Sequence, residues 1–314
     1  MADLLLMGVR FALFANLMLI AGLAAFPLYA LRPAEHGQLE PAALFFRPQP
    51  WLCALALLLS FGGMAVLTAA MQGVGVFAVD RGLFLAMVRE SDAGTAWLVR
   101  IAALFVAVAA SFLSGRKPSL AAAILFAAGS TALATLVWTG HAGATEGVLG
   151  WLHRANDALH MIAAAIWLGA IAAFLLLLRP GRSRGEACVA FAVHSLDQFA
   201  RVGTMCVLII TATGLVNGEF VIGAGNIARS AGSAYGQLLA VKLLLFAAML
   251  AFAAANRWRL TPALQTAVTA PDATRDPARA VASMRASLML EMAAGLAILA
   301  LVAWLGMLEP VGAG

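Results

Sequence analysis

Two histidines and an aspartate share one face of a long apolar segment. The segment extends from Gly150 to Leu178, and His153, Asp157 and His160 follow one another at intervals of four and three residues. In a helix this spacing puts all three side chains on the same face. Imidazole and carboxylate groups are ligands for transition metals, so this face predicts a metal site. Ionisable groups are costly at membrane depth and usually mark a site or a pathway.

A third histidine, His141, ends the preceding apolar segment within WTGHAGA. The loop that follows is short, so we expect the two segments to be antiparallel neighbours and His141 to approach the same face. We predict a copper site formed by His141 and His160, with His153 or Asp157 as a further ligand. The alternative is a polar cap, in which His153 extends to the membrane interface and Asp157 bonds a neighbouring cation.

The elements that must position these residues are membrane-spanning helices. Of the 314 residues, 63% are hydrophobic and 11% are charged, with a mean hydropathy of +0.94. Soluble domains carry about 25% charged residues. The composition predicts an all-α, polytopic transmembrane bundle, a single integral membrane domain over residues 1–314 whose partner is the lipid bilayer. Eight stretches are long enough to span it, near 4–31, 51–71, 96–114, 119–140, 152–178, 198–222, 235–256 and 285–307.

Basic residues predict the orientation. Loops on one side of the eight helices hold twelve Lys and Arg residues, and loops on the other side hold four. By the positive-inside rule the first side is cytoplasmic, so both termini and the histidine cluster face the periplasm of a bacterial inner membrane. The same distribution explains the net charge of +5 without nucleic-acid binding. The first stretch has no basic leader and is too long for a signal peptide, so we expect it to span the membrane.

The two longest loops are expected near residues 72–95 and 257–284. The first contains FAVDRGLFLAMV, which is typical of a short interfacial helix. The second contains Pro262, Pro271 and Pro277 and is expected to be a flexible loop.

Other charged residues fall within the predicted spans. Lys242 lies about two turns from the outer end of the seventh span, at the depth of Asp157, and needs a partner there. Pairing with Lys242 and binding a metal are competing roles for Asp157. Glu291, two turns from the cytoplasmic start of the eighth span, is a candidate proton relay or inner exit, or a structural hydrogen-bonding group. Arg10 and Arg100, near outer ends, are expected to extend to the interface.

Methionines could form a thioether path for Cu(I). Met64 and Met71 are seven residues apart on one face that leads outward, and Met87 in the outer loop is a candidate for copper capture. The other methionines are expected to pack in the membrane. The three cysteines are Cys53, Cys188 and Cys206, and no CxxC spacing links them. We expect them to pack as small apolar groups.

Several motifs together resemble the membrane domain of the copper resistance protein D family. They are TGHA, DALHMIAAAIWLGAIAAF, TATGLVNG and YGQLLAVKLLLFAAMLAFAAANRWRLTP, with weaker matches in TAWLVRIAAL and RASLMLEMAAGLAILALVAWLGMLEP. The resemblance covers roughly residues 95–310. It implies an inner-membrane protein that moves copper, often with a periplasmic copper-binding partner. By motif it assigns functional roles to these residues: His141, Asp157, His160, Trp167, Lys242 and Glu291.

The leading hypothesis is therefore a copper importer or permease, and not an enzyme. Copper, as Cu(I) or Cu(II), would bind at the periplasmic face and pass inward between the helices. No Walker A motif is present, so movement would be passive or ion-coupled. One alternative is a b-type haem electron-transfer protein, in which His141 and His160 are axial ligands. Another is an assembly factor that delivers copper to a membrane oxidase. A homo-oligomer is left open.

Overall fold

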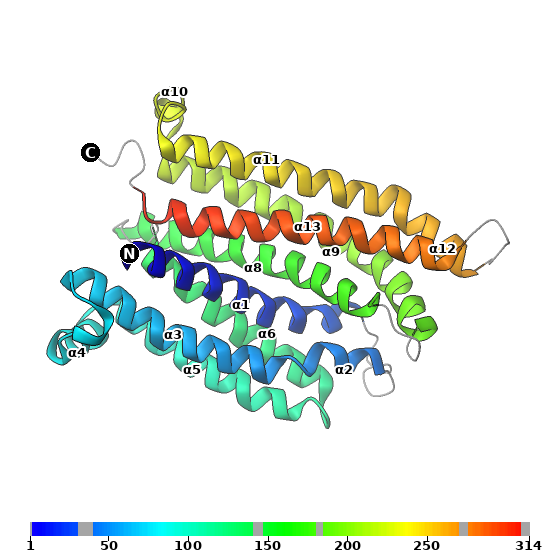
Figure 1. Cartoon of the computed structure of the whole chain (residues 1–314), viewed down its shortest axis with the longest axis horizontal. Coiled ribbons are helices and arrows are strands. Elements are labelled where there is room, and N and C mark those ends of the chain that lie inside the picture. Colours follow the sequence, from blue (N-terminus) through cyan, green and yellow to red (C-terminus); the bar gives the residue numbers. More distant parts are fainter. Residues whose placement is uncertain (1, 31–39, 141–146, 180–184, 270–275, 309–314) are drawn as a thin grey trace.

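The fold is a bundle of long helices (Figure 1). The computed structural model describes residues 2–30, 40–140, 147–179, 185–269 and 276–308. Within these ranges eight helices are long and apolar enough to cross a membrane, and no strand occurs. This confirms the predicted all-α, polytopic architecture. The eight spans follow from composition, because runs of 22 to 36 residues with high mean hydropathy cover the thickness of a bilayer.

Short helices and 3-10 turns connect several of the long helices. Their bounds are α1 (Ala2–Ala30), α2 (Glu40–Phe46), α3 (Gln49–Gln72), η2 (Val76–Ala78), α4 (Arg81–Glu90), α5 (Asp92–Leu113), α6 (Pro118–Ala134), η3 (Thr135–Thr139), α8 (Gly147–Leu177), α9 (Gly185–Val221), η4 (Ala224–Asn226), α10 (Ile227–Ser230), α11 (Ala234–Ala255), η5 (Asn256–Leu260), α12 (Thr261–Thr269) and α13 (Pro277–Leu305). The interfacial helix predicted between the second and third spans is α4, which Asp80 caps at its N-terminus through a bond from the backbone of Leu83.

The prediction of a flexible loop over residues 257–284 was wrong. The chain continues from α11 through the π-helical turn η5 into α12, and α13 already begins at Pro277. Pro277, taken as a loop signal, lies in the first turn of α13, where a missing N–H costs nothing. Pro262 lies within α12, in the continuous helical stretch that begins with α11. Residues 270–275 lie outside the described ranges, and Pro271 is among them.

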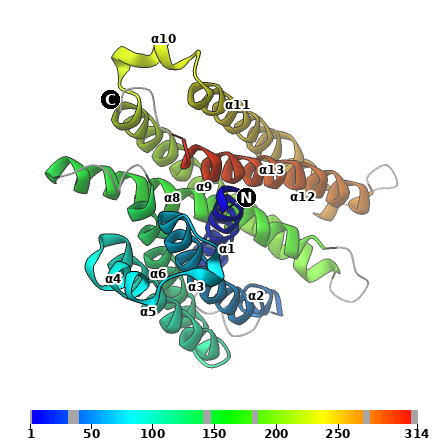
Figure 2. The same ribbon diagram turned by 60° about the vertical axis from the view of Figure 1, so that its left-hand side comes forward.

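Helix α1 lies at the centre of the bundle and packs on α8, α6 and α3. Helices α3, α5 and α6 form a group on one side of α1, and α11 and α13 lie on the other side (Figure 2). Gly22 of α1 and Gly169 of α8 allow the closest approach, because a Cβ built on Gly22 would lie 2.7 Å from the Cα of Gly169. Small residues at such crossings let helix backbones pack closely in a membrane. Helix α8, which carries the candidate histidines, is thereby fixed against the core.

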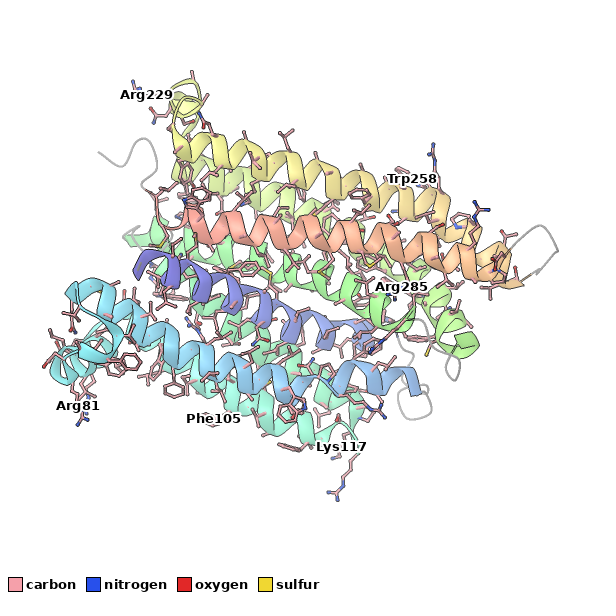
Figure 3. All side chains as sticks on the ribbon, viewed as in Figure 1. Arg81, Phe105, Lys117, Arg229, Trp258 and Arg285 are labelled. Atoms are coloured by element: carbon pink, nitrogen blue, oxygen red, sulfur yellow. The ribbon has the colours of Figure 1, made fainter. Side chains whose placement is uncertain are left out.

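Both the start of α1 and the end of α13 lie at one end of the bundle, here called the terminal end (Figure 1). Arg10 of α1 donates a hydrogen bond to the carbonyl oxygen of Gly306, directly after α13. Arg81 and Arg229 also lie toward the terminal end, whereas Lys117 lies toward the opposite end (Figure 3). The predicted orientation, with the terminal end in the periplasm, remains a prediction.

Candidate functional site

His160 of α8 is held against α9 by a threonine. Its Nδ1 atom lies 2.9 Å from Oγ1 of Thr213, and its ring edge packs over Gly214, where a Cβ would lie 3.6 Å from Cε1. Thr213 donates its own hydrogen to the carbonyl oxygen of Ile209. The threonine oxygen therefore accepts a hydrogen from Nδ1 of His160. This arrangement leaves the lone pair of the neutral imidazole on Nε2, the form in which histidine binds a metal.

Amide side chains connect the same two helices one turn closer to the terminal end. Asn156 of α8 donates to Oδ1 of Asn217 at 2.7 Å and to the carbonyl oxygen of Thr213 at 2.9 Å. Asn217 in turn donates to Oδ1 of Asp157 at 3.0 Å. The carboxylate of Asp157 is thus oriented by α9, in the same layer as the histidine.

Lys242 of α11 reaches this layer from a third helix. It lies near enough to Asp157 and His160 to act on both electrostatically, and Tyr235 of α11 lies within the same reach of Asp157. Lys242 is eight residues from the start of α11, as the predicted depth of two turns requires. Histidine, carboxylate and ammonium groups from α8 and α11 therefore share one region, supported by α9.

His153 has a different environment from His160. It is buried, and its ring stacks on Phe220 of α9 at 4.6 Å with the planes 9° apart. One residue on, Arg154 lies over the ring of Trp151, 4.8 Å from its centroid, and near the ring of Trp138 in η3. These contacts join the start of α8 to η3 and α9.

Each member of the predicted triad contacts a different residue of α9: His153 stacks on Phe220, Asp157 accepts from Asn217, and His160 is bonded to Thr213. Within the described part of the chain, no three His, Cys, Asp or Glu residues form a group close enough to hold a metal ion. His141, the remaining predicted ligand, lies outside the described residues.

A second polar site lies deeper in the bundle, around Glu291 of α13. Its carboxylate is 2% exposed and accepts hydrogen bonds from Nε1 of Trp167 at 2.7 Å and from Nδ2 of Asn256 at 2.9 Å. The predicted depth of Glu291 was wrong, because α13 begins at Pro277 and places the residue fourteen positions from either helix end. Asn256 begins the π-helical turn η5, and such turns are frequent at functional sites.

The candidate methionines lie in the other half of the bundle, on α3 and α4. Met64 is buried, Met71 is 70% exposed, and Met87 receives a weak contact from the hydroxyl of Thr68 at 3.8 Å. Helix α3 packs on α1 and α5, whereas the partners of His160 come from α9 and α11. All three cysteines are buried and free, as expected.

Sequence reasoning missed the residues that orient the candidate groups. Thr213 and Asn217 lie within TATGLVNG, and Asn256 begins NRWRL. These motifs carry the family resemblance, but Thr and Asn have no charge that would mark individual residues within them. A polar residue inside an otherwise apolar span is the signal that would have found them.

Two family profiles match the chain. They are described as copper resistance protein D-like, N-terminal domain, over residues 1–151, and copper resistance protein D, over residues 193–305. Copper resistance protein D of Pseudomonas syringae pv. tomato is 39% identical over 311 residues, which cover 99% of this chain and 98% of that protein. Inner membrane protein YebZ of Escherichia coli (strain K12) is 29% identical and covers 96% of this chain and 97% of its own length.

Copper transport protein CutJ of Bacillus subtilis (strain 168) is 34% identical over 180 residues, which are 52% of this chain and 30% of CutJ. No solved structure matches the chain. Two family profiles and near-complete alignment with a relative that is 39% identical agree with each other and with the eight-span fold. This chain therefore belongs to the copper resistance protein D family of membrane proteins.

Proposed function

We propose that this protein moves copper across the bacterial inner membrane and binds it first at His160, from the periplasmic side. The observation that carries the proposal is the bond between Nδ1 of His160 and Thr213, which directs the lone pair of the imidazole to Nε2. Copper accepts imidazole nitrogen in both of its common oxidation states. The names of two relatives, copper resistance protein D and copper transport protein CutJ, point to the same metal.

The ligand set combines His160 with His141, the partner expected from the sequence. His153 is stacked on Phe220 and serves as a support of α8 in this proposal. Asp157 offsets the positive charge of Lys242, which would otherwise oppose a copper cation beside His160. Capture by a periplasmic copper-binding protein would supply the metal to this face.

The proposed route continues along α8 toward Glu291. Trp167 lies seven residues after His160, on the same helix face, and its ring is 6.2 Å from that of Phe246 in α11. This aromatic pair separates the His160 layer from the buried carboxylate. Copper that moves inward must displace the pair, and Glu291 is then the next anionic group, able to exchange a proton for the cation.

The binding site is tested by metal analysis and a visible absorption spectrum of the protein purified in detergent. The parent is compared with His160→Ala and His141→Ala, and His194→Ala, an exposed position on α9, is the matched control. Copper affinity should fall about tenfold or more in the first two variants and stay unchanged in the control. Equal copper binding by parent and His160→Ala would contradict the site.

The same spectrum separates copper binding from the haem alternative. A Soret band that disappears when His141 or His160 is replaced would show that the protein binds haem through these residues. The b-type haem protein would then be favoured over the copper transporter. Delivery of copper to an oxidase would appear instead as lost oxidase activity, with unchanged copper uptake, when the gene is deleted.

The route is tested with Glu291→Gln in liposomes loaded with a copper-sensitive dye. Asn256 can rotate so that its unpaired Oδ1 accepts a hydrogen from the new amide, so the variant should fold. Copper binding should persist while uptake falls roughly tenfold or more, as expected when a group that carries protons is lost. Uptake equal to that of the parent would remove Glu291 from the route.

A further inference from the structure

A cavity in the other half of the bundle is lined by two arginines. It lies between α1, α3, α5 and η3, has a volume of about 60 Å³, and includes Arg10 and Arg100 in its lining. Arg10 and Arg100 each lie eight residues from the terminal end of their helices, which is about 12 Å at a rise of 1.5 Å per residue. Two permanent positive charges therefore share a small space inside the bundle.

The sequence predicted that Arg100 extends to the membrane interface, and this prediction was wrong. Its side chain is 5% exposed and enclosed by protein. Its Nε atom donates to Oγ1 of Thr135 at 2.8 Å, and the hydroxyl of Thr135 donates to the carbonyl oxygen of Ala132. This bond orients the guanidinium but uses one of its five N–H groups. Among the described residues no acceptor is bonded to the two terminal nitrogens of Arg100.

The lining supplies little negative charge. Arg10 donates to the carbonyl oxygen of Gly306 at 3.3 Å, where the carbonyl end of α13 carries a partial negative charge. The described residues that line the cavity include no Asp or Glu. Trp97 also lines it, but its indole N–H bonds to the carbonyl oxygen of Ser60. Arg100 is buried and Arg10 is half-buried, and both line the cavity, so their positive charges favour an anion there over a cation.

We propose that the cavity lined by Arg10 and Arg100 binds a small inorganic anion of the halide class. Its volume of about 60 Å³ is enough to hold a halide ion. Met64 lines the same cavity, but the two guanidinium groups oppose a copper cation beside its sulfur. The site would bridge α1 and α5 and is independent of the His160 layer.

The test measures the unfolding temperature of the purified protein in sodium chloride and in sodium gluconate at equal ionic strength. Chloride should raise the unfolding temperature of the parent saturably, by about 5 °C at a hundredfold excess over its dissociation constant. No difference between chloride and gluconate in the parent would overturn the proposal without any variant. Stabilisation by inorganic phosphate in place of chloride would overturn the halide assignment.

Variants then locate the effect. Arg100→Gln and Arg10→Gln should each weaken the chloride dependence about tenfold or more, whereas Arg81→Gln, exposed on α4, should retain it. If Arg100→Gln does not fold, Arg10→Gln alone decides the location. Equal chloride dependence in Arg10→Gln and the parent would contradict the site. Copper binding at His160 should be unchanged in Arg10→Gln, so the outcome does not depend on the proposed function.

Discussion

The indole nitrogen of Trp167 and the carboxylate of Glu291 are 2.7 Å apart, and their hydrogen bond joins α8 to α13 in the middle of the bundle. Trp167 is 3% exposed and Glu291 is 2% exposed, so neither group can exchange this partner for water. The second oxygen of Glu291 is bonded to Asn256, and the carboxylate is therefore satisfied from two helices. This arrangement makes the stability of the bundle depend on groups that also lie on the proposed copper route.

Replacing Trp167 by Phe should therefore destabilise the protein. The change keeps an aromatic ring but removes the N–H donor, leaving one buried oxygen of Glu291 without a partner. The free energy of unfolding should fall by about 1–3 kcal/mol, measured by denaturant titration in detergent. Trp258→Phe is the control, because that side chain is 72% exposed and should change the value by less than about 0.5 kcal/mol. A similar effect in both variants would contradict a specific role for the bond.

Thr213 should control copper affinity through His160 without contacting the metal. Thr213→Val keeps the shape of the side chain but removes the oxygen that accepts from Nδ1, so the ring loses its orientation and preferred tautomer. Copper affinity should fall about 10–100-fold, the range observed when such supporting groups are lost. Thr213→Ser retains the hydroxyl and should bind copper nearly as well as the parent. If Val and Ser variants bind alike in a competition assay with a copper chelator, the support has no effect.

The crossing of α1 and α8 should not accept a methyl group. In Gly22→Ala the new Cβ would overlap the carbonyl oxygen of Ala165, so the two helices must separate. The free energy of unfolding should fall by about 1–3 kcal/mol, as in other overpacked cores. Gly8→Ala on the same helix meets nothing within 4 Å and should be neutral or stabilising. Comparable destabilisation by both changes would show that the contact itself is unimportant.

The orientation of the bundle can be measured with single added cysteines. The three native cysteines are buried, so a membrane-impermeant maleimide should give little background labelling. Arg229→Cys, at the terminal end, should be labelled from the periplasm of intact cells, and Lys117→Cys should be labelled only after lysis (Figure 3). Reversed labelling would place the His160 layer toward the cytoplasm and reverse the proposed direction of copper entry.

Some features followed from the sequence alone because they depend on local composition. Length and hydropathy of each stretch were enough to predict eight spans, and the segment FAVDRGLFLAMV was enough to predict a short helix between two of them. The depth of Lys242 also followed, since Ala234 begins α11 where the apolar run begins. The depth of Glu291 did not, because prolines that signal a loop also begin helices.

The contacts that define the candidate site were decided only by the tertiary structure. His160 and Thr213 are 53 residues apart in the chain, and Trp167 and Glu291 are 124 apart. Apolar length determines that a segment spans the membrane, but lipid is as apolar as leucine, so hydropathy does not determine which faces of two helices meet. That choice depends on close packing at Gly22 and Gly169 and on hydrogen bonds between polar side chains. Only the packed bundle therefore separated His153, stacked on Phe220, from His160, whose Nδ1 is bonded to Thr213.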